Sequence, residues 1–156
     1  MLEADYLVIG GGALSFAFVD ELIHKSKDIT AIVVEKRAKP GGHWNDAYDF
    51  VRLHQPAAWY GVNSANLGKG GPDLVSKSQI LAYYELVTEV LKATNRVKFF
   101  WQCEYKGDGK IVSLIEDGLE YQVTVYISKA DSLSLIILIA TFFLQIIEDV
   151  ICSFPG

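Results

Sequence analysis

The sequence predicts an α/β fold with a parallel sheet and an inserted three-stranded antiparallel meander. Two observations predict it. Apolar runs of strand length, at Tyr6–Ile9 and at residues 29–34, flank the segment Ala13–Lys25, whose apolar residues have helical spacing. Further along, short strand-like segments at 97–105, 111–115 and 121–127 are separated by turns rich in Gly and Asp. The first pattern is typical of a β-α-β unit, and the second of an antiparallel meander.

Glycines follow the first predicted strand without a spacer. The spacing Gly10-x-Gly12-x-x-Ser15 is a dinucleotide-binding fingerprint with Ser in place of the last Gly. Gly10 makes the turn, and Gly12 lets the backbone approach a pyrophosphate at the N-terminus of the following helix. Ser15 is small enough for close packing of the helix on the strand. The segment therefore predicts a Rossmann-like, nucleotide-binding start of the fold.

An acidic residue ends the second predicted strand. Glu35 stands about 20 residues after Ser15, the distance that the fingerprint requires. A carboxylate there accepts hydrogen bonds from the ribose hydroxyls of an adenosine and repels a ribose 2′-phosphate. The sequence therefore favours FAD or NAD over NADP. The alternative is a Gly-rich turn with a solvated Glu and no ligand.

A second helix is predicted at residues 77–94. Ser76 and Gln79 have the spacing of a capping box, and apolar residues at helical spacing follow them. No chemistry is assigned to this helix or to the strands that come after it.

Composition limits the classes of function. The chain has 156 residues, enough for one ordinary domain, and its net charge of −5 with no cluster of Lys and Arg argues against a nucleic-acid partner. Cys103 and Cys152 are too few and too far apart for a disulfide framework or a metal motif. These cysteines give no reason to expect a metal site. No secretory signal precedes the fingerprint, so we expect a cytoplasmic protein.

The residues after Glu35 resemble a known family. They are similar to the FAD-binding N-terminal part of flavin-dependent monooxygenases and related FAD/NAD(P)-dependent oxidoreductases of glutathione-reductase-like fold. The resemblance covers residues 1–127, about four fifths of the chain. The features that carry it are the Gly-rich turn at 10–15, Glu35-Lys36-Arg37, Gly41-Gly42-His43-Trp44, and Val51-Arg52-Leu53-His54-Gln55-Pro56.

The resemblance implies a Rossmann-like FAD-binding domain with a defined set of cofactor contacts. Arg37 would lie beside the adenine or the phosphates, and the turn at 41–44 would pass near the isoalloxazine. No catalytic residue is assigned, because the flavin itself carries the chemistry. The residues expected to contact the cofactor are Gly10, Gly12, Ala13, Ser15, Glu35, Lys36, Arg37, Gly42, His43, Trp44 and His54.

The last segment, 128–156, departs from the family pattern. Its core, 133–147, is almost wholly apolar. At ~1.5 Å per residue it would make a helix of about 22 Å, shorter than the ~30 Å hydrocarbon core of a bilayer. Three interpretations stay open at this point: a buried strand or helix, a membrane anchor, and a tail that is not native to the fold.

The expected function is that of an incomplete, truncated flavin-dependent oxidoreductase of the monooxygenase type. Enzymes of the family run to several hundred residues and carry a second Gly-rich motif for NADPH, which is not found in this chain. The small-molecule substrate and the oligomeric state are not indicated. The alternative is a non-enzymatic Rossmann-like remnant, attached to a membrane or partner through the apolar tail. A simple NAD-dependent dehydrogenase is disfavoured, because no Tyr-x-x-x-Lys pair follows the fingerprint.

Overall fold

The computed structural model describes residues 1–126 with the exception of 70, 71 and 73. These residues form one compact unit, Met1–Tyr126. The expectations for 128–156, including attachment to a membrane through 133–147, lie outside the described residues.

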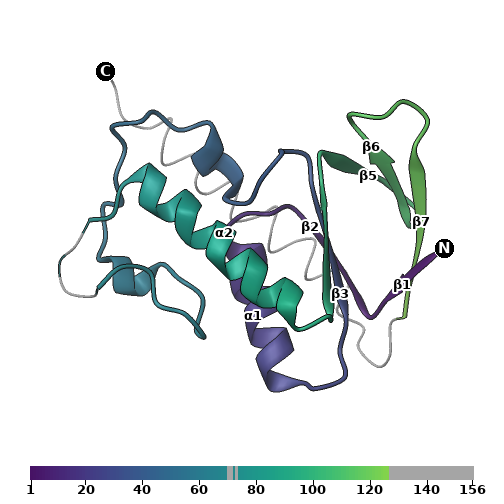
Figure 1. Cartoon of the computed structure of the whole chain (residues 1–156), viewed down its shortest axis with the longest axis horizontal. Coiled ribbons are helices and arrows are strands. Elements are labelled where there is room, and N and C mark those ends of the chain that lie inside the picture. Colours follow the sequence, from purple (N-terminus) through teal and green to yellow (C-terminus); the bar gives the residue numbers. More distant parts are fainter. Residues whose placement is uncertain (70–71, 73, 127–156) are drawn as a thin grey trace. The chain divides into compact units, whose positions relative to one another are not determined.

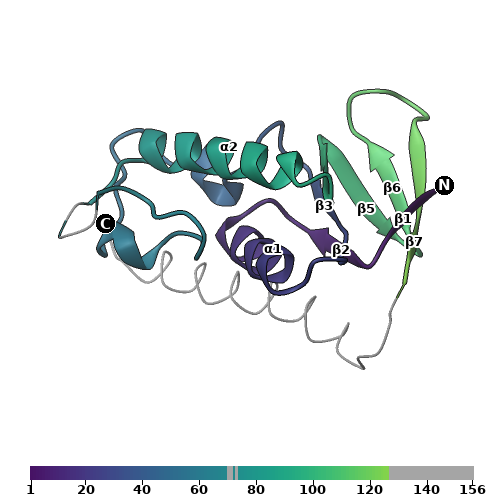
Figure 2. The same ribbon diagram turned by 60° about the horizontal axis from the view of Figure 1, so that its bottom comes forward.

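A three-stranded parallel sheet stands at the centre of the unit. Its strands β2 (Tyr6–Ile9), β3 (Ala31–Glu35) and β4 (Val97–Trp101) lie in the order β2-β3-β4, and both pairs are parallel. Helices α1 (Ala13–Lys25) and α2 (Lys77–Ala93) lie side by side against one face of this sheet (Figures 1 and 2). The predicted β-α-β unit and the bounds of the first helix are confirmed.

Strand β3 is buried along its whole length because it is covered on both faces. Successive side chains of a strand point to opposite faces. Ala31 and Val33 pack into the core under the helices, whereas Ile32 and Val34 pack into a second core on the other face. This explains the uninterrupted apolar run in the sequence, which is typical of a strand in a parallel sheet.

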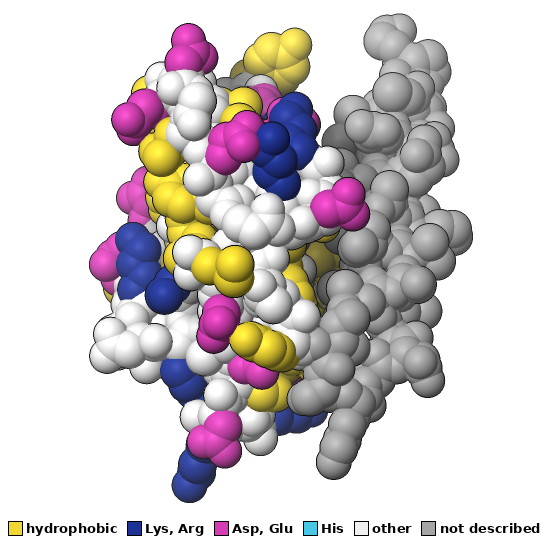
Figure 3. Space-filling view, turned by 90° about the vertical axis from the view of Figure 1, so that its right-hand side faces the viewer, with side chains coloured by type: hydrophobic (Ala, Val, Ile, Leu, Met, Phe, Trp, Pro, Cys, Tyr) yellow, Lys and Arg dark blue, Asp and Glu magenta, His cyan; other side chains and the backbone are white. Residues whose placement is uncertain are grey.

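A second sheet covers the other face. Its strands are β1 (Leu2–Ala4), β5 (Cys103–Gly107), β6 (Lys110–Ser113) and β7 (Glu120–Val125), in the order β1-β7-β6-β5. Strands β5, β6 and β7 form the predicted antiparallel meander. Strand β1, which the sequence pattern did not predict, joins it in parallel with β7. Basic and acidic side chains lie interspersed on the side of the molecule that carries this sheet (Figure 3).

The prediction of one strand over 97–105 is wrong. Two strands occupy this segment, β4 in the parallel sheet and β5 in the meander, and Gln102 lies between them with a φ of 51°. Its backbone N–H donates to the carbonyl oxygen of Arg37 at 3.0 Å, and its carbonyl accepts from Leu114 N at 2.7 Å. A left-handed residue with both backbone groups bonded turns the chain from one sheet to the other.

Helix α2 begins as predicted. Ser76 is its N-cap, and a capping box with Gln79 is present: the Ser76 hydroxyl accepts from the Gln79 N–H, and the Gln79 side chain accepts from the Ser76 N–H at 2.8 Å. The helix ends one residue earlier than expected, at Ala93, with Thr94 as its C-cap.

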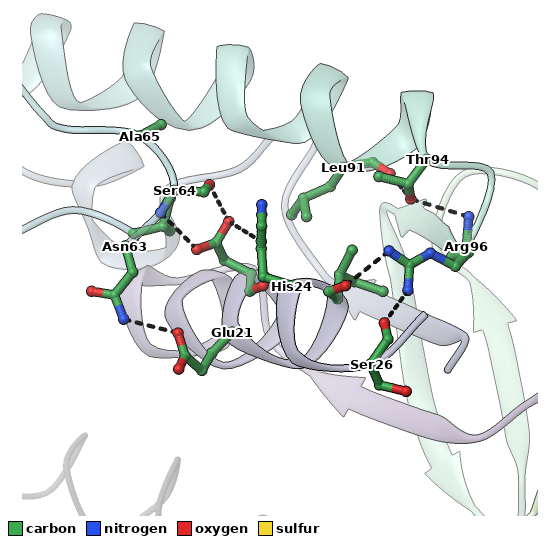
Figure 4. Close-up of polar contacts among 12 residues, drawn as sticks. Glu21, His24, Ser26, Asn63, Ser64, Ala65, Leu91, Thr94 and Arg96 are labelled. Atoms are coloured by element: carbon green, nitrogen blue, oxygen red, sulfur yellow. Dashed lines mark hydrogen bonds and ion pairs between the residues drawn. The ribbon is translucent and has the colours of Figure 1, made fainter. Parts of the chain in front are cut away.

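Buried polar side chains fix the loop that follows residue 60. Asp20 of α1 is 1% exposed and accepts hydrogen bonds from Ser64 N at 3.0 Å and from the Ser64 hydroxyl. Tyr83 of α2 accepts from Val62 N at 2.7 Å and donates to Ala65 O at 2.6 Å. The loop is thus bonded to both helices, and Figure 4 shows its contacts with α1.

Arg96 ties the end of α1 to the start of β4. Its guanidinium donates to the carbonyl oxygens of Ser26, at 2.5 Å, and of Ile23, at 2.8 Å (Figure 4). These carbonyls are among those that a helix C-terminus leaves without an intrahelical partner.

Among the helices of the described residues, none is both long enough and apolar enough to cross a bilayer.

Candidate functional site

The glycine-rich turn connects β2 to the N-terminus of α1 at the carboxyl edge of the parallel sheet. Gly10 has a φ of +99°, and its N–H donates to Val34 O at 2.8 Å. Gly12 is the N-cap of α1 in an extended conformation, and no side chain in the described part of the chain caps the helix. The N–H groups of the first turn therefore keep their capacity to bind an anion, which the helix dipole favours.

Glu35 is 4% exposed at the end of β3 and lies directly beside this turn. Its Oε2 accepts from Gly11 N at 2.6 Å, and its Oε1 accepts from Arg37 N at 2.8 Å. Gly11 is closely surrounded, because a Cβ there would lie 3.1 Å from the Trp101 ring and 3.2 Å from Glu35, and these side chains would have to shift to accept it. The carboxylate is thus held in place while each oxygen retains a further lone pair.

A second pair of glycines packs on the first turn. Gly41 N donates to Gly11 O at 2.9 Å. Gly41 and Gly42 have φ angles of +111° and +53°. A Cβ on Gly42 would lie 2.9 Å from the Cα of Gly12. The two backbone segments approach so closely that only glycine fits at this point.

Trp44 and His43 follow on the short helix η1 (Gly42–Asn45). Trp44 is buried, and its Nε1–H donates to the Tyr60 hydroxyl oxygen at 2.6 Å. Burial raises the pKa of Tyr60, so this hydroxyl stays neutral. His43 is exposed in part, with its ring centroid 5.4 Å from that of Trp44. Partial desolvation and then the charge of Arg37 lower the pKa of His43, which favours the neutral imidazole.

The two cations after Glu35 each meet a carboxylate. Lys36 Nζ lies 2.8 Å from Glu104 Oε1 on β5. Arg37 donates from Nε to Asp46 Oδ2 at 2.9 Å and also from Nη2 to the same oxygen, and its Nη1 lies 3.6 Å from Glu35 Oε1. The bond to Asp46 raises the pKa of Arg37 and lowers the pKa of Asp46.

Most of the residues predicted from the sequence therefore meet around two touching turns. Ala13 and Ser15 lie half-buried in the first turn of α1. His54 is exposed on the loop after Leu53 and is not among the residues that meet there. Among the described residues, no group of three His, Cys, Asp or Glu side chains is arranged to hold a metal ion.

Sequence reasoning missed two contributors. Gly11 bonds with both Glu35 and Gly41, and its only signal was that it is the middle glycine of three. Asp46 carried no signal, since its pairing with Arg37 depends on how the turn at 41–44 folds back.

The architecture is that of flavin-dependent oxidoreductases. A flavin-containing monooxygenase from Stenotrophomonas maltophilia matches with a TM-score of 0.59 and 21% identity, over 79% of this chain and 37% of that one. A bacillithiol disulfide reductase from Staphylococcus aureus matches with a TM-score of 0.60 and 16% identity, over 79% and 36%. These matches confirm the fold class and the resemblance to part of a flavin monooxygenase.

Curated sequence relatives share more identity with this chain than these solved structures do. Uncharacterized proteins of Mycobacterium tuberculosis and Mycobacterium bovis are 46% identical over 135 residues, covering 80% of this chain and 25% of theirs. The chain thus spans about a quarter of the length of the curated relatives it matches. No protein-family model matches.

Proposed function

We propose that the described unit binds FAD and serves as the FAD-binding part of a flavin-dependent oxidoreductase of the monooxygenase type. The observation that carries the proposal is the position of Glu35. Its carboxylate is fixed beside a glycine turn that leads into an uncapped helix N-terminus. An acid for the ribose and N–H groups for the pyrophosphate are the two features that this class of dinucleotide site needs.

Different residues of the site fit the successive groups of the cofactor. The N–H groups of the first turn of α1 would bind the pyrophosphate, and Glu35 would accept hydrogen bonds from the ribose hydroxyls. The close contact of Gly42 with Gly12 leaves the surface of this turn free of side chains, so a ligand backbone can approach. Trp44, fixed by its bond to Tyr60, offers a rigid apolar wall farther along.

A bound flavin would supply the electron-transfer chemistry itself. The contribution of this chain is to bind and orient. The turn carrying His43 would contact the flavin end, and the lowered pKa of that imidazole would keep it uncharged there at neutral pH. Lys36, Arg37 and His54 stay predictions as cofactor contacts.

FAD binding can be tested on the purified chain by visible absorption and by quenching of flavin fluorescence. We expect saturable binding that weakens at least about tenfold in Gly12→Val and in Glu35→Ala, since loss of one such interaction is about 1.4 kcal/mol or more. Glu120→Ala is the matched control, because this acid pairs with Lys110 in the meander and has no part in the turn. Folded protein that binds no FAD, or equal losses in Glu35→Ala and Glu120→Ala, would contradict the proposal.

A non-enzymatic nucleotide-binding module is the second candidate. It predicts nucleotide binding that is weak or absent, without any oxidation of a nicotinamide by the purified chain. Oxidation of NADPH or NADH by the FAD-loaded chain would favour the oxidoreductase part over the non-enzymatic module.

A further inference from the structure

Two carboxylates surround the guanidinium of Arg37 at the edge of the proposed site. Asp46 accepts from Nε and from Nη2, while Glu35 Oε1 lies 3.6 Å from Nη1. Two negative groups face one positive group, so the cluster carries a net negative charge. Arg37 therefore donates to Asp46 from two of its three guanidinium nitrogens, and the third lies near Glu35.

Arginine at this position has a specific meaning in a dinucleotide site. An acid at the end of the second strand recognises free ribose hydroxyls, and an arginine close by recognises a 2′-phosphate. This chain has both residue types two positions apart, Glu35 and Arg37. The contacts of Arg37 decide whether the arginine is available for a phosphate.

We propose that Asp46 is a selectivity residue of this site, because it holds the Arg37 guanidinium and so denies a ribose 2′-phosphate its cation. The site then favours an adenosine whose 2′-hydroxyl is free, as in FAD and NAD, over one that carries a 2′-phosphate. Lys36, the other cation next to Glu35, is held in the same way by Glu104, at 2.8 Å. The inference rests on the proposed dinucleotide site and adds a residue that its fingerprint does not contain.

The solvent exposure of Asp46 and Arg37 fits a role in selectivity better than a role in the stability of the fold. The side chain of Asp46 is 65% exposed and that of Arg37 39% exposed. Ion pairs this exposed contribute little to stability, so Asp46→Asn is expected to fold. The same substitution removes one negative charge beside Arg37 and weakens the bonds that hold this planar donor, whose shape matches phosphate geometry.

The test compares two probes that differ only in the 2′-phosphate, ADP-ribose and 2′-phospho-ADP-ribose, as competitors of FAD on the full chain. In the unmodified protein we expect the phosphorylated probe to bind at least about tenfold more weakly. In Asp46→Asn this ratio should shrink by about tenfold. In the double variant Asp46→Asn with Arg37→Gln it should return to that of the unmodified protein, because the gain requires a free guanidinium.

Asp49→Asn serves as the matched control. Asp49 is a nearby exposed acid that pairs with Lys77 at 3.0 Å, and its loss should leave the ratio unchanged. If Asp46 only supported the fold of its turn, both probes would weaken together and the ratio would stay constant, which would overturn the inference. A chain that binds FAD but shows equal affinities for the two probes would also overturn it and would leave the proposed function intact. A folded chain that binds neither FAD nor ADP-ribose would overturn both.

Discussion

Gly42→Ala is expected to lower both the free energy of unfolding and the affinity of the proposed site for FAD. Gly42 has a φ of +53°, and an added Cβ would lie 2.9 Å from the Cα of Gly12. A left-handed conformation costs a residue with a Cβ about 1–2 kcal/mol. Crowding a packed position costs about 1–3 kcal/mol more, and here the neighbour is backbone, which cannot rotate away.

Gly118→Ala separates these two costs. Gly118 has a similar conformation, with a φ of +79°, but a Cβ there would have no atom of the described residues within 4 Å. We expect Gly118→Ala to lower the free energy of unfolding by about 1–2 kcal/mol. Gly42→Ala should lower it by about 2–5 kcal/mol, the sum of both costs.

Urea denaturation followed by circular dichroism measures both variants against the unmodified chain. The difference between them, about 1–3 kcal/mol, reports the collision of the two turns alone. Gly42→Ala should also weaken FAD binding, because Gly12 would have to move away. Equal losses of stability in the two variants would refute the close approach of these turns.

Three further outcomes are expected. Asp20→Asn should lower the free energy of unfolding by about 1.5–3 kcal/mol in urea denaturation, because a buried carboxylate loses its charge-assisted bonds to Ser64; a change within experimental error would contradict this role. Tyr83→Phe should cost about 1–3 kcal/mol in the same assay, since the hydroxyl bonds two backbone groups of the loop, and cleavage of that loop by protease should become faster. Hydrogen bonds from Lys106 and Lys36 lower the pKa of Glu104 to about 2 from its usual 4.5. Because the folded pKa is the lower one, these pairs stabilise the fold above the unfolded pKa and are lost as pH falls toward 2. The difference in Tm between the unmodified chain and Glu104→Gln should therefore disappear over that range, and a constant difference would contradict it.

Local sequence patterns predicted those elements whose signal is a short run of apolar residues or a capping motif. The run Tyr6–Ile9, the capping box at Ser76 and the helix Ala13–Lys25 are all found at the expected places. Each of these signals involves residues within a few positions of one another, so the sequence alone contains it.

Long-range contacts account for what was missed. Asp20 is a charged residue that nothing nearby in the sequence marks as buried, because its hydrogen-bond partner Ser64 lies 44 positions along the chain. The break at Gln102 carries no Gly or Pro, and it is imposed by two sheets that the chain must join. Asp46 joins the site only because two turns fold against each other. In the site, the fingerprint predicted which residues lie there, whereas the hydrogen-bond partners of those residues depend on tertiary contacts.

Strand β3 has a thermodynamic consequence for the proposed site. Because Val33 and Ile32 belong to different cores, neither the helical layer nor the meander can separate without exposing one face of this strand. The unit is therefore expected to unfold cooperatively, with the backbone amides of β3 among the slowest to exchange with deuterium. Glu35 ends this strand, so the carboxylate proposed to select the ribose is anchored in a segment that is expected to be among the last of the described chain to open.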